Sequence, residues 1–125
     1  MISKKIEKSI NEQINAELYS AYLYLSISAD MESKNLNGAA AWMKAQAQEE
    51  AGHAMKFYGY LAERGGKVEL MAIKEPKKEW DSLLEAFEDA YEHECYISGR
   101  INDMMDLAVE EKDYATITML QWFVE

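Results

Sequence analysis

Hydrophobic residues recur in alternating steps of four and three positions along most of this chain. Such a period places one apolar seam along a helix, so it predicts helices over about 3–32, 37–64, 82–110 and from 114 onward. The first two seams are Ile6, Ile10, Gln13, Glu17, Ser20, Tyr24, Ile27, Met31 and Ala39, Met43, Gln46, Glu50, His53, Phe57, Tyr60. The third is Leu83, Phe87, Ala90, Glu94, Ile97, Ile101, Met104, Ala108, and the fourth begins Tyr114, Ile117, Gln121, Val124. Four such seams predict an all-α four-helix bundle.

Residues 67–79 contain the only proline and separate the second predicted helix from the third. About 13 extended residues reach ~43 Å, and a helix of about 27 residues is ~40 Å long. This connector can therefore cross the whole bundle, so that the third helix runs parallel to the second.

The other boundaries carry local signals. The short polar stretch 33–37 suits an antiparallel turn, and Asn37 is a candidate N-cap for the second helix. Gly65 and Gly66 end that helix. Residues 82–85 read Ser-Leu-Leu-Glu, which fits a capping box, and Asp113 can cap the short fourth helix.

Four ionisable residues interrupt the apolar seams, namely Glu17, Glu50, His53 and Glu94. In an antiparallel pair, Glu17 lies 18 residues before the first turn and His53 lies 18 after it, which puts both at one level, about 25 Å from the turn. Glu94 lies 17 or 18 residues before the second turn and reaches mid-height as well. Buried carboxylates are unfavourable unless they are paired, and a metal ion would stabilise all four side chains at once.

Neighbouring polar and aromatic residues have other predicted roles. His93 is adjacent to Glu94 but points about 100° away around the helix, so we expect it to pack rather than to ligate. We expect Gln13 to form hydrogen bonds within the polar layer, and Trp122 and Phe123 to contribute packing.

Composition narrows the class of protein. The chain has 125 residues, which favours one domain over 1–125. Its net charge of −10 argues against nucleic acid as a partner. Cys95 is the only cysteine, and the sequence contains no apolar run of membrane-spanning length and no secretory signal at its start. We therefore expect a cytoplasmic protein with no membrane partner.

Several motifs occur in order along the whole chain. They read Asn-Glu-Gln at 11–13, Glu-Leu-Tyr-Ser at 17–20, Ala-Gln-Ala-Gln-Glu-Glu at 45–50 with His53, Tyr-Glu-His-Glu at 91–94 and Gln-Trp-Phe-Val at 121–124. With these motifs the chain resembles a ferritin of the haem-free bacterial or archaeal type. The resemblance implies a ferritin-like four-helix bundle and storage of ferric mineral in a homo-oligomeric shell of 24 subunits. It also implies a di-iron centre that oxidises Fe(II) with O2 or H2O2, which is ferroxidase activity.

The resemblance also assigns roles to residues. It implies iron ligands at Glu17, Glu49, Glu50, His53 and Glu94, with Tyr24 beside the centre. Glu17, Glu50 and His53 would hold the first iron, Glu50 would bridge, and Glu94 would hold the second. Glu49 would belong to a weaker third site or an exit path, although a solvated glutamate is the simpler interpretation.

Two departures from the family pattern affect these expectations. Ferritins carry further Glu or Gln ligands on the second half of the fourth helix, followed by a short fifth helix, so we expect a truncated fourth helix and a C-terminally incomplete domain. Gly52 stands where haem-binding relatives have a methionine, so no haem is expected. Two alternatives remain open, namely a truncated, non-catalytic metal-binding helical bundle and a structural fragment whose acidic residues are merely solvated.

Overall fold

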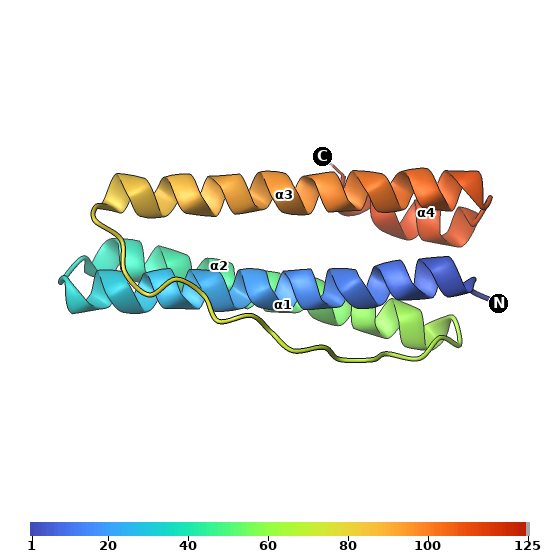
Figure 1. Ribbon diagram of the computed structural model, residues 1–125, viewed down its shortest axis with the longest axis horizontal. Helices are drawn as coiled ribbons and strands as arrows, with labels where there is room; N and C mark the ends of the chain where they lie inside the picture. The colour runs from blue at the N-terminus through green and yellow to red at the C-terminus, as the bar shows by residue number, and fades with distance from the viewer. Residues whose placement is uncertain (125) are drawn as a thin grey trace.

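Four helices form most of residues 1–124, the part of the chain that the computed structural model describes. They are α1 (Lys4–Ser33), α2 (Asn37–Glu63), α3 (Leu83–Glu110) and α4 (Tyr114–Gln121). α1 and α2 form an antiparallel hairpin, and the connector then runs back along α1, so that α3 is parallel to α2 (Figure 1). The turn between α3 and α4 lies at the opposite end of the bundle from the turn between α1 and α2 (Figure 1). The predicted all-α bundle with a long crossover and a short fourth helix is confirmed.

Polar side chains of α1 fix the path of the connector. Asn11 Nδ2 donates to the carbonyl of Lys67 at 3.0 Å, and Asn11 Oδ1 accepts from the backbone N–H of Glu69 at 2.8 Å. One turn along, Asn15 Nδ2 donates to the carbonyl of Ala72 at 3.1 Å. These bonds satisfy backbone groups that no helix or strand would pair, and they hold the crossover against the bundle.

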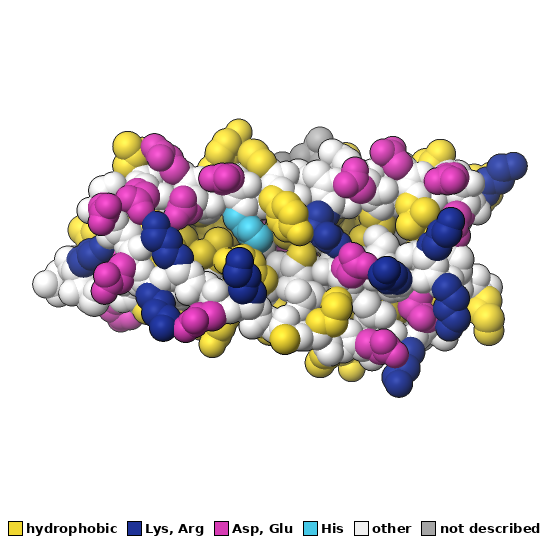
Figure 2. Space-filling view, viewed as in Figure 1, with side chains coloured by type: hydrophobic (Ala, Val, Ile, Leu, Met, Phe, Trp, Pro, Cys, Tyr) yellow, Lys and Arg dark blue, Asp and Glu magenta, His cyan; other side chains and the backbone are white. Residues whose placement is uncertain are grey.

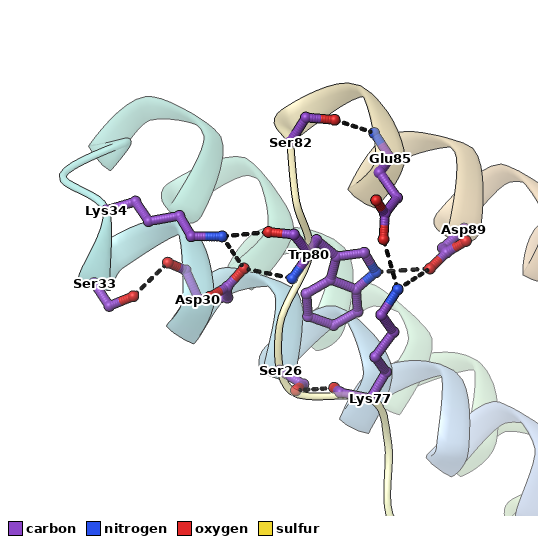
Figure 3. Close-up of polar contacts among 9 residues, drawn as sticks. All are labelled: Ser26, Asp30, Ser33, Lys34, Lys77, Trp80, Ser82, Glu85 and Asp89. Atoms are coloured by element: carbon purple, nitrogen blue, oxygen red, sulfur yellow. Dashed lines mark hydrogen bonds and ion pairs between the residues drawn. The ribbon is translucent and has the colours of Figure 1, made fainter.

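The end of the connector is anchored by Trp80, which is 2% exposed. Its backbone N–H donates to Asp30 Oδ2 at 3.1 Å, and its carbonyl accepts from the ammonium of Lys34 (Figure 3). Its indole Nε1 donates to Asp89 Oδ2 at 2.7 Å, and Lys77 Nζ lies 3.6 Å from the same carboxylate oxygen (Figure 3). Trp80 therefore joins α1 to the first turns of α3.

The first three helices end in the same way. One residue in the turn that follows each helix has a positive φ. These residues are Asn35 at 61°, Gly65 at 78° and Lys112 at 56°. The next backbone N–H then bonds to the carbonyl five residues earlier, at 2.9 to 3.0 Å, which satisfies a free carbonyl of the last turn. The predicted N-cap at Asn37 is wrong, because Asn37 is the first residue of α2 and Leu36 is the cap, without a side-chain bond. This backbone motif orients the chain into α2 by itself.

The predicted N-caps at Ser82 and Asp113 are confirmed, but only half of the predicted capping box forms among the described residues, because Glu85 Oε1 accepts from Lys77 Nζ at 2.6 Å. Ser82 Oγ accepts from the backbone N–H of Glu85 at 3.1 Å, and Asp113 Oδ1 accepts from that of Thr116 at 3.1 Å. Each bond satisfies a free N–H in the first turn of its helix.

The predicted seams differ in how well they match the buried faces. All eight residues of the α1 seam are buried. On α2, Met43, Glu50 and Phe57 are buried, and the other seam residues lie partly exposed at the edge of the face. On α3, Leu83 and Phe87 are 38% and 37% exposed, because α4 covers only the other half of α3 (Figure 1).

The predicted α4 seam is wrong at three of its four positions, because Gln121 is exposed as well as the residues at both ends. Tyr114 is 71% exposed and Val124 is 44% exposed, whereas Thr116 and Leu120 are buried. The hydroxyl of Thr116 lies 2.7 Å from that of Tyr60 on α2, and this hydrogen bond turns Thr116 inward.

The buried residues form two apolar clusters along the bundle. One includes Ile6, Ile10, Ile14, Phe57, Leu61, Ile97, Ile101, Met104 and Leu120, and the other includes Leu23, Tyr24, Ile27, Met31, Met43, Ala47, Trp80 and Ala90. On each of α1, α2 and α3, the sequence gap between the two clusters contains Glu17, Glu50 or Glu94. A polar layer therefore divides the core.

The surface seen in Figure 2 carries acidic and basic side chains interspersed, with hydrophobic side chains between them. The net charge of −10 is therefore not expressed as a uniformly acidic surface on this face. Over the described residues, every helix falls short of the length or the apolarity that crossing a bilayer requires.

Candidate metal centre

The polar layer brings together three side chains from two helices. Ligand atoms of Glu17 on α1 and of Glu50 and His53 on α2 all lie within 4.8 Å of one another. Glu17 is 0% exposed and Glu50 is 4% exposed. Two carboxylates and one imidazole at this separation form a donor set that suits a divalent transition metal. The predicted common level of these three residues is confirmed.

The hydrogen bonds in this group leave one oxygen free. His53 Nδ1 lies 3.2 Å from Glu50 Oε2 and 3.7 Å from Glu17 Oε2. Glu17 Oε1 accepts from Gln13 Nε2 at 3.0 Å, which confirms the predicted hydrogen bonding of Gln13 within the polar layer. Glu17 Oε2 is buried and has no hydrogen-bond partner among the described residues. Buried polar atoms are normally satisfied, so an unpaired carboxylate oxygen beside an imidazole fits the role of a ligand to a cation.

Glu94 reaches the same cavity from α3. This cavity, of about 490 Å³, is lined by residues that include Glu17, Glu49, Glu50, His53 and Glu94. Glu94 Oε1 accepts from the Tyr24 hydroxyl at 2.9 Å. Glu94 is not among the three residues whose ligand atoms lie within 4.8 Å. The cavity therefore contains one compact group of donors and one further carboxylate held by a tyrosine.

The electrostatics of the cavity reflect crowded negative charge. The carboxylates of Glu17 and Glu50 raise the pKa of His53 to about 10 by hydrogen bonding and attraction to the imidazolium. Burial, together with the neighbouring Glu50, raises the pKa of Glu94 to about 7. Burial also raises the pKa values of Glu50 and Tyr24 above their ordinary values. Without a cation the cavity therefore retains protons, and a bound cation would displace them.

Glu49 is the remaining predicted ligand, and it lies at the edge of the cavity, whereas His93, which was predicted to pack, does not line it. Glu49 is exposed at the rim. His93 packs edge-on against Tyr19, with ring centroids 5.3 Å apart, and its Nε2 lies 2.5 Å from Ser20 Oγ. Burial lowers the pKa of His93. Packing, rather than contact with the cavity, is the role we expected for His93.

Aromatic side chains line the cavity beside His53. The rings of Trp122 and Phe123 meet the imidazole edge-on, with centroids 5.7 and 5.6 Å away. Phe123 also stacks on Phe57 at 4.3 Å. These residues were predicted to pack, and their packing holds the imidazole against the two carboxylates.

Arg100 is a residue that the sequence pattern did not single out. Its Nε donates to Gln13 Oε1 at 3.0 Å, and Gln13 in turn bonds to Glu17. Arg100 lies on the edge of the buried face of α3, one position before Ile101. Nothing in its spacing distinguishes it from a solvated arginine, so only the packed structure identifies the contact.

Comparison with known proteins agrees with this architecture. The Ferritin family, described as a ferritin-like domain, matches residues 7–125. A bacterial non-heme ferritin of Campylobacter jejuni is 45% identical over 99% of this chain and 74% of its own length. A bacterial non-heme ferritin of Bacteroides fragilis is 44% identical over 99% of this chain and 78% of its own length.

Solved structures show the same relationship. The open-pore ferritin of Archaeoglobus fulgidus superposes with a TM-score of 0.98 at 51% identity, covering 99% of this chain and 76% of that one. A ferritin of Chlorobium tepidum superposes with a TM-score of 0.96 at 43% identity, with coverage of 99% and 76%. This chain therefore spans about three quarters of the length of these relatives.

Proposed function

Because this chain belongs to the ferritin family, we propose that it binds Fe(II) in the polar layer between α1, α2 and α3 and oxidises it to Fe(III). In this proposal the ferric product is stored as mineral in a homo-oligomeric shell, without haem. Iron is the substrate and the cargo, and each Fe(II) gives one electron to O2 or H2O2.

One observation carries the proposal. Two buried carboxylates and an imidazole converge within 4.8 Å, and one carboxylate oxygen has no partner among the described residues. A bundle selected only for stability would fill this layer with apolar side chains, because uncompensated buried charge is strongly destabilising. A divalent cation neutralises the carboxylates and accepts the lone pair of the imidazole.

The proposed roles follow from position in the cavity. Glu17, Glu50 and His53 hold the first Fe(II), and Glu50 faces the second position, which Glu94 serves. Tyr24 orients Glu94 through the 2.9 Å hydrogen bond. Glu49, at the exposed rim, belongs to a weaker site on the path by which iron enters or leaves.

Oxidation kinetics test the proposal directly. The metal-free protein is mixed with Fe(II) without oxygen, oxygen is admitted, and ferric absorbance is followed. Glu50→Ala should reduce the rate to that of Fe(II) in buffer, because it removes the carboxylate that both positions share. Glu63→Ala is the matched control, since Glu63 is an exposed glutamate near the end of the same helix. Equal rates in the wild type and Glu50→Ala would refute the proposed activity.

A second candidate is a non-catalytic metal-binding bundle. The compact donor group contains only Glu17, Glu50 and His53, enough for one ion, while Glu94 is bound to Tyr24. The number of ions bound separates the two candidates. About two ions per chain support the oxidase, and one tightly bound ion without faster oxidation supports the second candidate.

Assembly is tested separately by the size of the native particle. A hollow particle of about 24 subunits supports mineral storage, and a monomer or dimer refutes storage by this chain while leaving iron oxidation to the kinetic test.

A further inference from the structure

We propose that Arg100 is a positioning residue for the metal centre, acting through Gln13 to fix which oxygen of Glu17 faces the cation. This inference rests on the proposed function, because it concerns the same carboxylate. Arg100 touches no metal-binding side chain itself, and its effect passes through a neutral amide.

The contacts form a continuous relay from the surface to the cavity. Arg100 Nε donates to Gln13 Oε1 at 3.0 Å, and Gln13 Nε2 donates to Glu17 Oε1 at 3.0 Å. Gln13 and Glu17 are both 0% exposed. The Arg100 side chain is 23% exposed, and its Nη2 lies 3.8 Å from Glu12 Oε2 at the surface. The relay therefore joins a surface ion pair to a fully buried carboxylate.

The chemistry of these groups allows only one direction for the amide. A guanidinium can donate but cannot accept, so it requires the oxygen of Gln13. The NH2 group of Gln13 must then face Glu17, whose ionised carboxylate can only accept. Without Arg100, the bond to Glu17 would be the one contact left among the described residues to orient the amide, so both Gln13 and the Glu17 carboxylate would be held less firmly.

This orientation determines how Glu17 is presented to a metal. Oε1 is occupied by Gln13, while Oε2 is unpaired among the described residues and lies 3.7 Å from His53 Nδ1. Glu17 is therefore presented with one free oxygen, which favours binding through that oxygen alone. Groups that orient metal ligands in this way typically change metal affinity by 10–100-fold when removed.

The sign of the effect distinguishes a relay from simple electrostatics. A positive charge near a cation site opposes binding, so loss of the Arg100 charge alone would tighten binding. Loss of the relay would weaken binding instead. Placing a neutral amide between Arg100 and Glu17 gives orientation without a cation directly beside the ligand.

The test uses Co(II) as the probe, titrated into the metal-free full chain and followed by its visible absorption bands. We expect Arg100→Met and Arg100→Lys to raise the dissociation constant by about 10–100-fold. Arg100→Lys keeps the charge but puts a methylene where Nε stands, so it separates loss of the donor from loss of charge. The bands should also weaken, because a released Glu17 can bind with both oxygens and raise the coordination number.

A double-mutant cycle with Gln13→Met tests the route. If Arg100 acts through Gln13, then Arg100→Met should cause no further loss of affinity in the Gln13→Met background. Glu12→Gln is the control, because it removes only the surface counter-ion of Arg100 and should change affinity by less than about twofold. Circular dichroism melting establishes that each variant is folded, and Arg100→Lys carries the test if Arg100→Met does not fold.

The outcomes separate this inference from the proposed function. Unchanged or tighter Co(II) binding in folded Arg100 variants, or additive losses in the double mutant, would overturn the relay and leave the metal centre intact. A wild-type chain that binds neither Co(II) nor Fe(II) would overturn the metal centre, and the relay with it.

Discussion

Binding of a divalent cation should release about one proton from His53. The imidazole lies 3.2 and 3.7 Å from two carboxylate oxygens, which raise its pKa to about 10. A metal needs the lone pair that this proton occupies, so the two compete for the same nitrogen. His53→Gln is the perturbation, because glutamine is polar but carries no titrating proton.

The expected number of protons follows from the pKa values of the cavity. With a pKa of about 10, His53 is about 99% protonated at pH 8. With a pKa of about 7, Glu94 retains only about 10% of its proton at that pH. The wild type should therefore release more protons per first cation than His53→Gln does, with a difference of up to about one. Its apparent dissociation constant should also fall by about tenfold for each pH unit from 7 to 9.

Calorimetric titration with Co(II) in two buffers of different ionisation enthalpy measures the protons released. His93→Gln is the matched control, because His93 lies outside the donor group and burial lowers its pKa, so it is neutral at pH 8. Its proton count should equal that of the wild type. Equal release by the wild type and His53→Gln would refute a protonated His53 between the carboxylates.

Two further predictions concern stability. In the metal-free protein, the raised pKa of His53 gives stability that is fully present below pH 6.5 and is lost as pH rises through about 10. The melting temperature should therefore fall over this range, and a fall of the same size in His53→Gln would contradict the assignment. Trp80→Ala should lower the free energy of unfolding by about 3–5 kcal/mol in urea denaturation, because it empties a buried site and removes the bond to Asp89. Trp42→Ala is the control, because Trp42 is 48% exposed, and it should lower the free energy of unfolding by about 1 kcal/mol or less. If both variants lowered the free energy of unfolding equally, Trp80 would not anchor the crossover.

Every residue of the predicted α1 seam is buried, although the buried face also includes Asn11, Ile14, Leu23, Ser28 and Asp30. The sequence pattern was less successful on α3 and α4. α1 packs along α2 for most of its length and carries the connector on another side, so its inward face is constant (Figure 1). α3 is covered by α4 over only part of its length, which leaves Leu83 and Phe87 over a third exposed. Periodicity reports which face is apolar, whereas burial also depends on whether another helix is present to cover it.

Helix ends show a similar limit. Ser82 and Asp113 cap their helices as their residue types suggest, and Gly65 takes the positive φ that glycine favours. Lys112 adopts positive φ at the equivalent position after α3, although lysine has no preference for it. The close return from α3 to α4 imposes that conformation, and no local sequence signal reports it.

The sequence could predict the candidate centre only as far as the position of a residue along the helix axis decides which side chains on neighbouring helices meet. Residue spacing gives height at 1.5 Å per residue, which is sufficient to bring Glu17 and His53 to one level of an antiparallel pair. Spacing does not give the reach of a side chain or its direction around the axis, and the contact from Arg100 to Gln13 depends on both. The residues that would contact the cation can thus be identified in the sequence, because they are polar at positions where the seam is otherwise apolar. The residue that orients them lies at the edge of the seam, where an arginine is ordinary, and only its packed neighbours reveal its role.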